Sequence, residues 1–196
     1  MEPELVALLS ELETWGRQHD AGERDHGKRM LNLAPDTARL LSILVCSSHR
    51  TRLLEIGTSN GYSTIWLAWA AGRSGGHLTS IDRRPEKLVA AEANLRRAGL
   101  HDRVTLHGGD ATEVITTLAG PFDFIFFDAD RTSAPRQLAL LLPKLTPDAF
   151  VCADNAISHP TEIASYLNAI QARPEFDHVI VPVGNGLSIA HKSAAH

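Results

Sequence analysis

The chain has 196 residues, of which 43% are hydrophobic and 21% are charged. This composition supports one domain with a buried core and excludes a disordered polymer. Its 19 Lys and Arg against 23 Asp and Glu give a net charge of −4. Nucleic acids and anionic membranes attract clustered basic residues, so the charge balance argues against both as partners.

The sequence shows no sign of membrane insertion or export. The longest unbroken apolar run is Ile65–Ala71, far short of the roughly 18 residues that a membrane span requires. Residues 1–13 are acidic, whereas a secretion signal starts with basic residues. Cys46 and Cys152 lie far apart, so neither a disulfide scaffold nor a zinc site is expected. We expect a cytoplasmic protein.

The N-terminal part of the chain is predicted to be helical. Apolar residues recur at helical spacing between Leu5 and Trp15, which indicates an amphipathic helix. The polar segment Asp20–Arg29 is expected to be a surface connection. Pro35 suits the first turn of a second helix that runs to about Cys46.

From Arg52 onward, short apolar runs alternate with helical stretches, which is typical of a parallel sheet covered by helices on both faces. The predicted strands are Leu53–Ile56, Leu78–Ile81, Val104–His107, Phe124–Phe127 and Phe150–Ala153. The predicted helices lie near Ser63–Ala71, Pro85–Ala98, Thr112–Leu118, Ser133–Leu142 and Thr161–Ala172. Gly99 stands where a left-handed cap ends a helix.

The end of the chain departs from this alternation. Two strand-like runs, His178–Val181 and Leu187–Ala190, are joined by five residues. A connection this short cannot hold a crossover helix, so the two runs are expected to form an antiparallel hairpin at the sheet edge. No repeat or linker divides the chain, and we predict a single domain over residues 1–196.

The turn after the first predicted strand is rich in glycine, and two nucleotide-binding patterns fail there. A dinucleotide fingerprint that starts at Gly57 requires glycine where Ser59 and Tyr62 stand. A phosphate-binding P-loop requires lysine after Gly61, where the chain has Tyr62.

A serine esterase is a second interpretation, since Gly57 to Gly61 match the G-x-S-x-G nucleophile elbow. Ser59 is then the nucleophile. The other triad members are drawn from Asp128 or Asp154 and His178 or His191. Against it, the preceding segment is helical rather than a series of strands, and no His-Gly-Gly oxyanion turn lies upstream.

A third interpretation is a site for S-adenosylmethionine. Glu55 stands at the end of the first strand, before two glycines four residues apart. Asp82 ends the second strand about 20 residues further on, the distance expected for an acid that binds ribose hydroxyls. S-adenosylmethionine carries a ribose and an amino acid without phosphate, so Glu55 can lie near its ammonium group. The alternative is a tight turn with a surface aspartate.

Three oxygen donors follow neighbouring strands. Asp128 ends the fourth predicted strand, and Asp154 and Asn155 end the fifth. Ligands bind outside the carboxyl ends of parallel strands, and an all-oxygen set suits Mg²⁺ or another divalent cation. Alternatively, Asp128 or Asp154 caps the helix that follows it.

Together these residues resemble the metal-dependent O-methyltransferases of the catechol and caffeoyl-CoA type. The resemblance runs from Met30 to Lys192, and the order and spacing of the motifs carry it. Its specific parts are Leu54–Thr58 with Gly61–Ser63, Ile81-Asp82, Gly109–Ala111, Phe127–Asp130, Ala153–Asn155 and the terminal Pro182–Leu187.

The resemblance implies an α/β class I methyltransferase fold, that is, a Rossmann-like, doubly wound, seven-stranded and mostly parallel sheet with an antiparallel C-terminal hairpin. By the same resemblance, residues 1–50 are expected to form a helical cover for a small-molecule substrate on a core of residues 51–196, and the family commonly forms homodimers. The implied cofactor-binding residues are Glu55, Gly57, Thr58, Ser59, Ser63, Asp82, Asp110, Ala111 and Asp128. The implied metal ligands are Asp128, Asp154 and Asn155.

The chain departs from the family pattern at two positions. Arg131 replaces a lysine that often serves as the base, and arginine does not release its proton in proteins. Ala134 replaces a tyrosine, which alters the substrate contacts. The candidate catalytic residues are therefore Asp128, Arg131 as an electrostatic clamp, and His159 as a proton acceptor. A metal-independent methyltransferase and a protein that only binds the cofactor remain alternatives.

Overall fold

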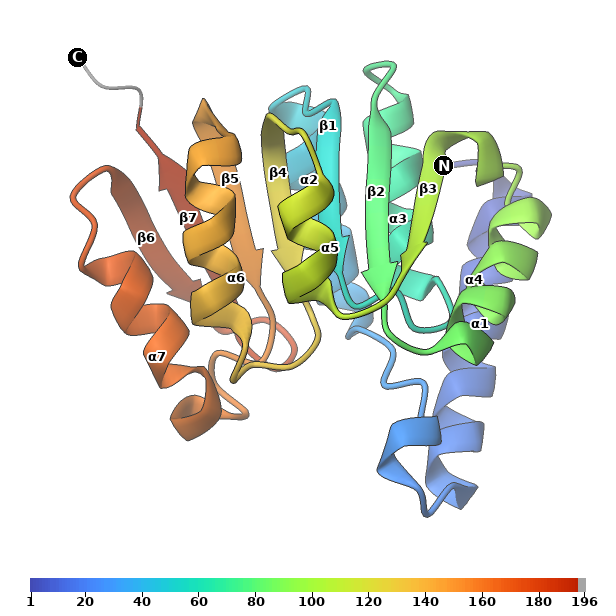
Figure 1. The fold of residues 1–196 in the computed structure, drawn as a ribbon. Coiled ribbons are helices and arrows are strands. Elements are labelled where there is room, and N and C mark those ends of the chain that lie inside the picture. The colour runs from blue at the N-terminus through green and yellow to red at the C-terminus, as the bar shows by residue number, and fades with distance from the viewer. Residues whose placement is uncertain (194–196) are drawn as a thin grey trace.

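The computed structural model describes residues 1–193, and residues 194–196 of the predicted domain lie outside that range. Its seven strands form one sheet in the order β3-β2-β1-β4-β5-β7-β6 (Figure 1). The strands are β1 (Arg52–Ile56), β2 (His77–Asp82), β3 (Val104–Gly108), β4 (Phe122–Phe127), β5 (Leu145–Ala153), β6 (Phe176–Val181) and β7 (Leu187–Lys192). The α-helices are α1 (Pro3–Gly22), α2 (Pro35–Ser47), α3 (Tyr62–Gly72), α4 (Pro85–Arg97), α5 (Ala111–Thr117), α6 (Ala134–Leu141) and α7 (Pro160–Gln171).

The sheet is parallel except at β7. Strands β1 to β5 pair in parallel, whereas β7 lies antiparallel between β5 and β6. This confirms the predicted doubly wound sheet and its C-terminal hairpin. Gly99 has φ +66°, which confirms the left-handed position after α4.

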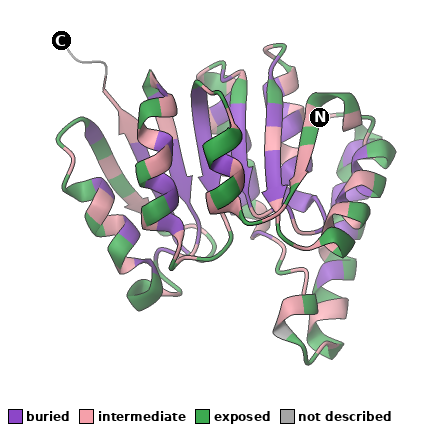
Figure 2. Ribbon diagram, in the orientation of Figure 1, coloured by how far each residue is buried: buried purple, intermediate pink, exposed green. Residues whose placement is uncertain are grey.

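Helices cover both faces of the sheet, and each face has its own core. One core packs α1 to α4 against the sheet, and the other packs α5 to α7 against the opposite face (Figure 2). Every residue of β4 is buried, because β4 lies in the middle of the sheet between these two layers. The unalternating apolar run of β4 is the sequence signature of this position.

The N-terminal helix is longer than predicted. It continues to Gly22, so Asp20 to Gly22 belong to α1 rather than to a surface connection. Trp15 does not join the buried face, because 45% of its surface is exposed and its ring stacks on His19. Figure 1 shows that the last turns of α1 extend beyond the sheet, at the edge where the parallel strands end.

Two further findings concern membrane spans and the cysteines. No helix within residues 1–193 combines the length and the apolar character of a membrane span. Cys46 and Cys152 are both free thiols.

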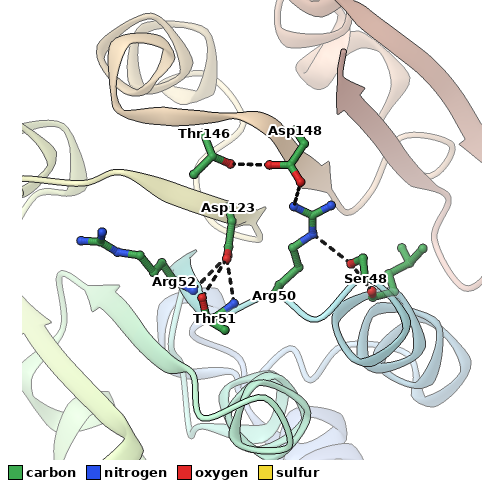
Figure 3. A network of polar contacts seen from close by, with 8 residues as sticks. Ser48, Arg50, Thr51, Arg52, Asp123, Thr146 and Asp148 are labelled. Atoms are coloured by element: carbon green, nitrogen blue, oxygen red, sulfur yellow. Dashed lines mark hydrogen bonds and ion pairs between the residues drawn. The ribbon is translucent and has the colours of Figure 1, made fainter. Parts of the chain in front are cut away.

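A polar network joins the amino-terminal ends of the central strands (Figure 3). The buried Asp123 carboxylate of β4 accepts hydrogen bonds from the backbone N–H groups of Thr51 (2.7 Å) and Arg52 (2.9 Å). Next to it, the buried Arg50 forms an ion pair with Asp148 of β5 at 2.9 Å. These contacts fix the start of β1 against its neighbours at the edge opposite the predicted site.

Removing the Asp123 carboxylate tests this anchor. We predict that Asp123→Ala lowers the free energy of unfolding by about 2–3 kcal/mol, because two backbone N–H groups lose their acceptor. The measurement is urea unfolding. Asp177→Ala is the control, since Asp177 is exposed on β6, and its effect is expected to stay within about 0.5 kcal/mol. Equal losses in the two variants would contradict the anchor.

Candidate active site

The glycine turn, residues 57–61, connects β1 to α3 at the edge where the parallel strands end. Gly57 has φ +111°, and a Cβ atom there would lie 2.3 Å from the backbone oxygen of Asp128. Only glycine allows β1 and β4 to end this close together. The turn and the Asp128 segment therefore form adjoining walls of one site.

Glu55 lies under the glycine turn and is fully buried. Its carboxylate accepts three short hydrogen bonds of 2.6 Å, from the hydroxyls of Ser63, Thr64 and Ser80. The Ser80 hydroxyl also lies 2.6 Å from that of Thr58. Glu55 thereby joins β1, the first turn of α3 and β2. A direct contact between Glu55 and a ligand ammonium stays a prediction.

Burial governs the protonation of Glu55. Loss of hydration raises the pKa of its carboxyl to about 7, and the hydroxyl donors only partly oppose this increase. Near neutral pH the group therefore exchanges between charged and neutral forms without leaving the protein interior.

Asp82 lies at the end of β2, beside the glycine turn. Its carboxylate accepts the backbone N–H groups of Ser59 (2.8 Å) and Arg84 (3.0 Å). Two such bonds fix the orientation of the carboxylate and leave lone pairs for further donors. This arrangement suits the predicted contact with a ribose.

Ser59 has a structural partner instead of a catalytic one. Its hydroxyl donates to the carbonyl of Met30 at 2.6 Å, and the described chain contains no hydrogen bond between it and a histidine. His178 instead pairs with Ser188 at 2.9 Å. This geometry does not support the nucleophile elbow.

Asp110 and Ala111 lie where β3 leads into α5. The exposed Asp110 carboxylate accepts the backbone N–H of Thr112 at 2.8 Å and so caps α5. Gly109, just before it, donates its backbone N–H to the carbonyl of Asp82 at 3.1 Å. The predicted adenine wall is therefore attached directly to the end of β2.

Asp128, Asp154 and Asn155 line one cavity at the ends of β4 and β5, together with Arg131. The backbone N–H of Asp154 donates to the Phe127 carbonyl at 3.0 Å, which ties the two strand ends together. Neither aspartate caps the next helix, since α6 and α7 start after Ser133 and His159 without side-chain caps. The capping interpretation is therefore wrong.

The negative charges of Asp128 and Asp154 are not balanced by the positive charges around them. Burial, the Asp154 charge and the Glu55 charge raise the pKa of Asp128 well above its usual range, against the opposing effect of Arg131. Burial also raises the pKa of Asp154, whereas the backbone of Asn155 and the side chain of Asn185 lower it. Two carboxylates in this situation favour a bound cation.

The donor set fits a hard divalent ion. The buried Oδ1 atom of Asp154 has no hydrogen-bond partner among residues 1–193. The Oδ1 atom of Asn155 accepts the Ser158 hydroxyl at 3.1 Å and can still offer a lone pair. Carboxylate and amide oxygens are the ligands that Mg²⁺ prefers. The part of the chain that the structure describes has no cluster of three or more His, Cys, Asp or Glu side chains suited to a metal.

Arg131 lines this cavity, whereas His159 is not one of its lining residues and reaches the site only through the effect of its charge, which lowers the pKa of Asp154. Glu162 of α7 binds the Arg131 guanidinium through Nε (2.9 Å) and Nη2 (2.8 Å). The His159 Nδ1 atom lies 2.8 Å from the Ser158 hydroxyl. Both side chains are thus held near the aspartates by neighbours in the sequence or on α7.

Several contributors to the site have no signal in the sequence. Thr64 and Ser80 donate hydroxyl hydrogen bonds to Glu55. Neither residue belongs to a sequence motif that would distinguish it from other residues of its helix or strand. Asn185 belongs to the β6–β7 turn, and its carbonyl accepts the N–H groups of Ile157 and Ser158, both at 3.0 Å. These residues come from distant segments, so only the folded chain brings them together.

Comparison with known proteins agrees with this geometry. Residues 54–156 match the model of a methyltransferase domain. A catechol O-methyltransferase from Niastella koreensis is 33% identical over 135 residues, covering 67% of this chain and 61% of the relative. One from Mycobacterium tuberculosis is 38% identical over 120 residues, covering 61% of this chain and 54% of the relative. The chain thus spans less than two thirds of the length of these two relatives.

A solved structure extends the comparison to the whole fold. An O-methyltransferase of tomaymycin synthesis from Streptomyces achromogenes, in complex with SAM, superposes with a TM-score of 0.81. It is 27% identical, and the match covers 98% of this chain and 91% of that one. The sheet, the glycine turn and these matches define a methyltransferase domain. The chain belongs to the class I O-methyltransferase family.

The buried carboxyl of Glu55 makes a testable contribution to stability. Its pKa is about 7 in the folded chain, above the ordinary value of 4.5 for an exposed glutamate, so the folded state binds the extra proton and stability falls as pH rises. Between pH 5 and pH 8 we predict a loss of about 2–3 kcal/mol in wild type that Glu55→Gln does not show. Urea unfolding at both pH values measures it.

Glu113→Gln serves as the matched control for this pH experiment, because Glu113 is exposed on α5. It should follow the pH dependence of wild type. Parallel pH curves for wild type and Glu55→Gln would show that Glu55 ionises as an ordinary exposed carboxyl.

Proposed function

We propose that the chain is an S-adenosylmethionine-dependent O-methyltransferase that transfers a methyl group to a hydroxyl of a catechol-like or phenolic acceptor with the help of a divalent ion. The observation that carries this proposal is the adjacency of two sets of oxygen donors. Asp82 lies beside the glycine turn, and Gly57 brings that turn against Asp128. The cavity that Asp128 lines is also lined by Asp154, whose buried Oδ1 atom has no hydrogen-bond partner among residues 1–193.

The cofactor is assigned to the glycine turn and the ends of β1, β2 and β3. Asp82 is oriented by two backbone N–H groups and accepts the ribose hydroxyls. The methionine end lies along Gly57, Thr58 and Ser63, with Glu55 fixing the Ser63 hydroxyl from below. Asp110 and Ala111 border the adenine.

The divalent ion is assigned to Asp128, Asp154 and Asn155. When bound there, it supplies a positive charge that lowers the pKa of a coordinated hydroxyl and directs its oxygen. The chain's contribution is to hold the two carboxylates at adjoining strand ends through the bond between Asp154 and Phe127.

The reaction is an in-line displacement. The acceptor oxygen forms a bond to the methyl carbon while the bond from that carbon to sulfur breaks, and sulfur keeps the electron pair as S-adenosylhomocysteine leaves. The hydroxyl loses its proton. His159 is the proposed acceptor of this proton. Arg131 keeps its own proton and stabilises negative charge from the position that Glu162 gives it.

Residues 1–50 are proposed to form the substrate cover of this single domain. α1 reaches past the sheet at the site edge, and the segment after it returns to α2 across that edge (Figure 1). Two relatives named as catechol O-methyltransferases support the proposed acceptor class. A homodimer and a cytoplasmic location stay predictions.

Removing the ion or one of its ligands tests the proposal. With a panel of catechols, hydroxycinnamoyl thioesters and phenols as acceptors, EDTA is expected to lower turnover at least about 100-fold and added Mg²⁺ to restore it. Asp154→Ala should lose turnover to a similar extent and still bind S-adenosylhomocysteine, because Asp82 and the glycine turn are unchanged. Asp177→Ala is the control, since Asp177 is exposed on β6 and lies outside the proposed substrate cover and the site.

The outcomes separate the parts of the proposal. Undiminished turnover in EDTA and in Asp154→Ala would refute the metal role and leave a metal-independent methyltransferase. Calorimetry that detects no S-adenosylhomocysteine binding to wild type would refute the cofactor assignment itself.

A further inference from the structure

The segment between α1 and α2, residues 23–34, is called the strap here. It crosses the site edge and is fixed at Met30 and Leu31 by Asp20, near the end of α1. The Oδ1 atom of Asp20 accepts the backbone N–H of Met30 at 2.6 Å, and Oδ2 accepts that of Leu31 at 2.8 Å. A carboxylate that accepts one N–H on each oxygen forms strong, charge-assisted bonds.

The strap also contacts the glycine turn. The carbonyl of Met30, whose N–H is bound to Asp20, accepts the Ser59 hydroxyl at 2.6 Å. One residue earlier, the carbonyl of Arg29 accepts the Lys87 ammonium of α4 at 2.9 Å. The strap is therefore attached to α1, the glycine turn and α4 at three successive backbone positions.

Backbone strain is concentrated in this contact. Leu31 has φ +51° and Ser59 has φ +48°, a region that residues other than glycine rarely occupy. Such conformations are energetically unfavourable and persist only where surrounding contacts impose them. Asp20 supplies this constraint for Leu31, and the bonds of Ser59 to Met30 and Asp82 supply it for the turn.

A continuous series of hydrogen bonds thus leads from Asp20 to Asp82, the residue that is proposed to bind the ribose. Asp20 holds Met30, Met30 holds the Ser59 hydroxyl, and the Ser59 N–H holds Asp82. We propose that Asp20 is a positioning residue for the cofactor, which docks the strap on the glycine turn and thereby sets the geometry of Ser59 and Asp82. This inference rests on the proposed cofactor site.

Docking of the strap should slow the dissociation of the cofactor and leave the rate of methyl transfer unchanged. In this proposal the strap contacts do not change during methyl transfer, so they stabilise the ground state and the transition state equally. Loss of Asp20 should therefore raise the KM for S-adenosylmethionine with little change in kcat. A variant that is merely misfolded would lose kcat and stability together.

The experiment compares S-adenosylhomocysteine binding to wild type, Asp20→Ala, Asp20→Asn and Asp25→Asn, by calorimetry for Kd and by stopped-flow for the dissociation rate. Asp20→Ala should weaken binding about tenfold, through faster dissociation. Asp20→Asn keeps one acceptor oxygen and should fall between. Asp25→Asn is the matched control and should stay within about twofold, because the Asp25 carboxylate accepts the Gly27 N–H at 2.9 Å, a contact within the strap itself.

A double-mutant cycle with Ser59→Ala tests whether Asp20 acts on the cofactor site through Ser59. If Asp20 acts through the bond between Met30 and Ser59, Asp20→Ala should cost less in the Ser59→Ala background than in wild type. Full additivity would overturn this route.

The remaining outcomes are equally clear. If Asp20→Ala binds like wild type, weakens no more than Asp25→Asn, or loses kcat with unchanged cofactor affinity, the positioning role is wrong and the proposed function stands. If wild type itself does not bind S-adenosylhomocysteine, both the proposed function and this inference are overturned.

Discussion

The burial of one carboxyl group, that of Glu55, organises the site. A carboxylate inside the protein is costly unless hydrogen bonds replace its hydration. Here three hydroxyls meet that requirement, and they come from α3 and β2. Satisfying Glu55 therefore fixes the direction in which α3 leaves the glycine turn and the place where β2 ends. Gly57 then allows the turn to lie against the Asp128 backbone.

The site edge concentrates negative charge in a chain that is only mildly acidic overall. Glu55, Asp82, Asp128 and Asp154 lie at the ends of β1, β2, β4 and β5. Burial and mutual repulsion raise the pKa of Asp128, and Arg131 only partly compensates. Such an edge favours cationic ligands, because they relieve the repulsion. A sulfonium cofactor and a divalent ion are both cations, so one electrostatic property supports both assignments.

The sequence predicted most of the fold because its local signals agree with the tertiary structure. The unalternating β4 run, the proline of α4 and the five residues between β6 and β7 each indicate one structure. The prediction for Asp20–Arg29 was partly wrong, since polar residues also suit the exposed end of a helix. The positions of Asp82, Asp128 and Asp154 could be predicted because the carboxyl ends of parallel strands lie at one edge of the sheet. The partners of Glu55 and the strap contacts of Asp20 could not, because they depend on packing between distant segments.

A crystal structure of the chain with S-adenosylhomocysteine tests the central claim most directly. The account predicts electron density for the nucleoside at the strand-end edge, with both ribose hydroxyls on Asp82 and the amino acid end along Gly57 and Ser63. The strap should retain its bond to Ser59. A nucleoside bound elsewhere, or an empty edge at saturating concentration, would contradict the account.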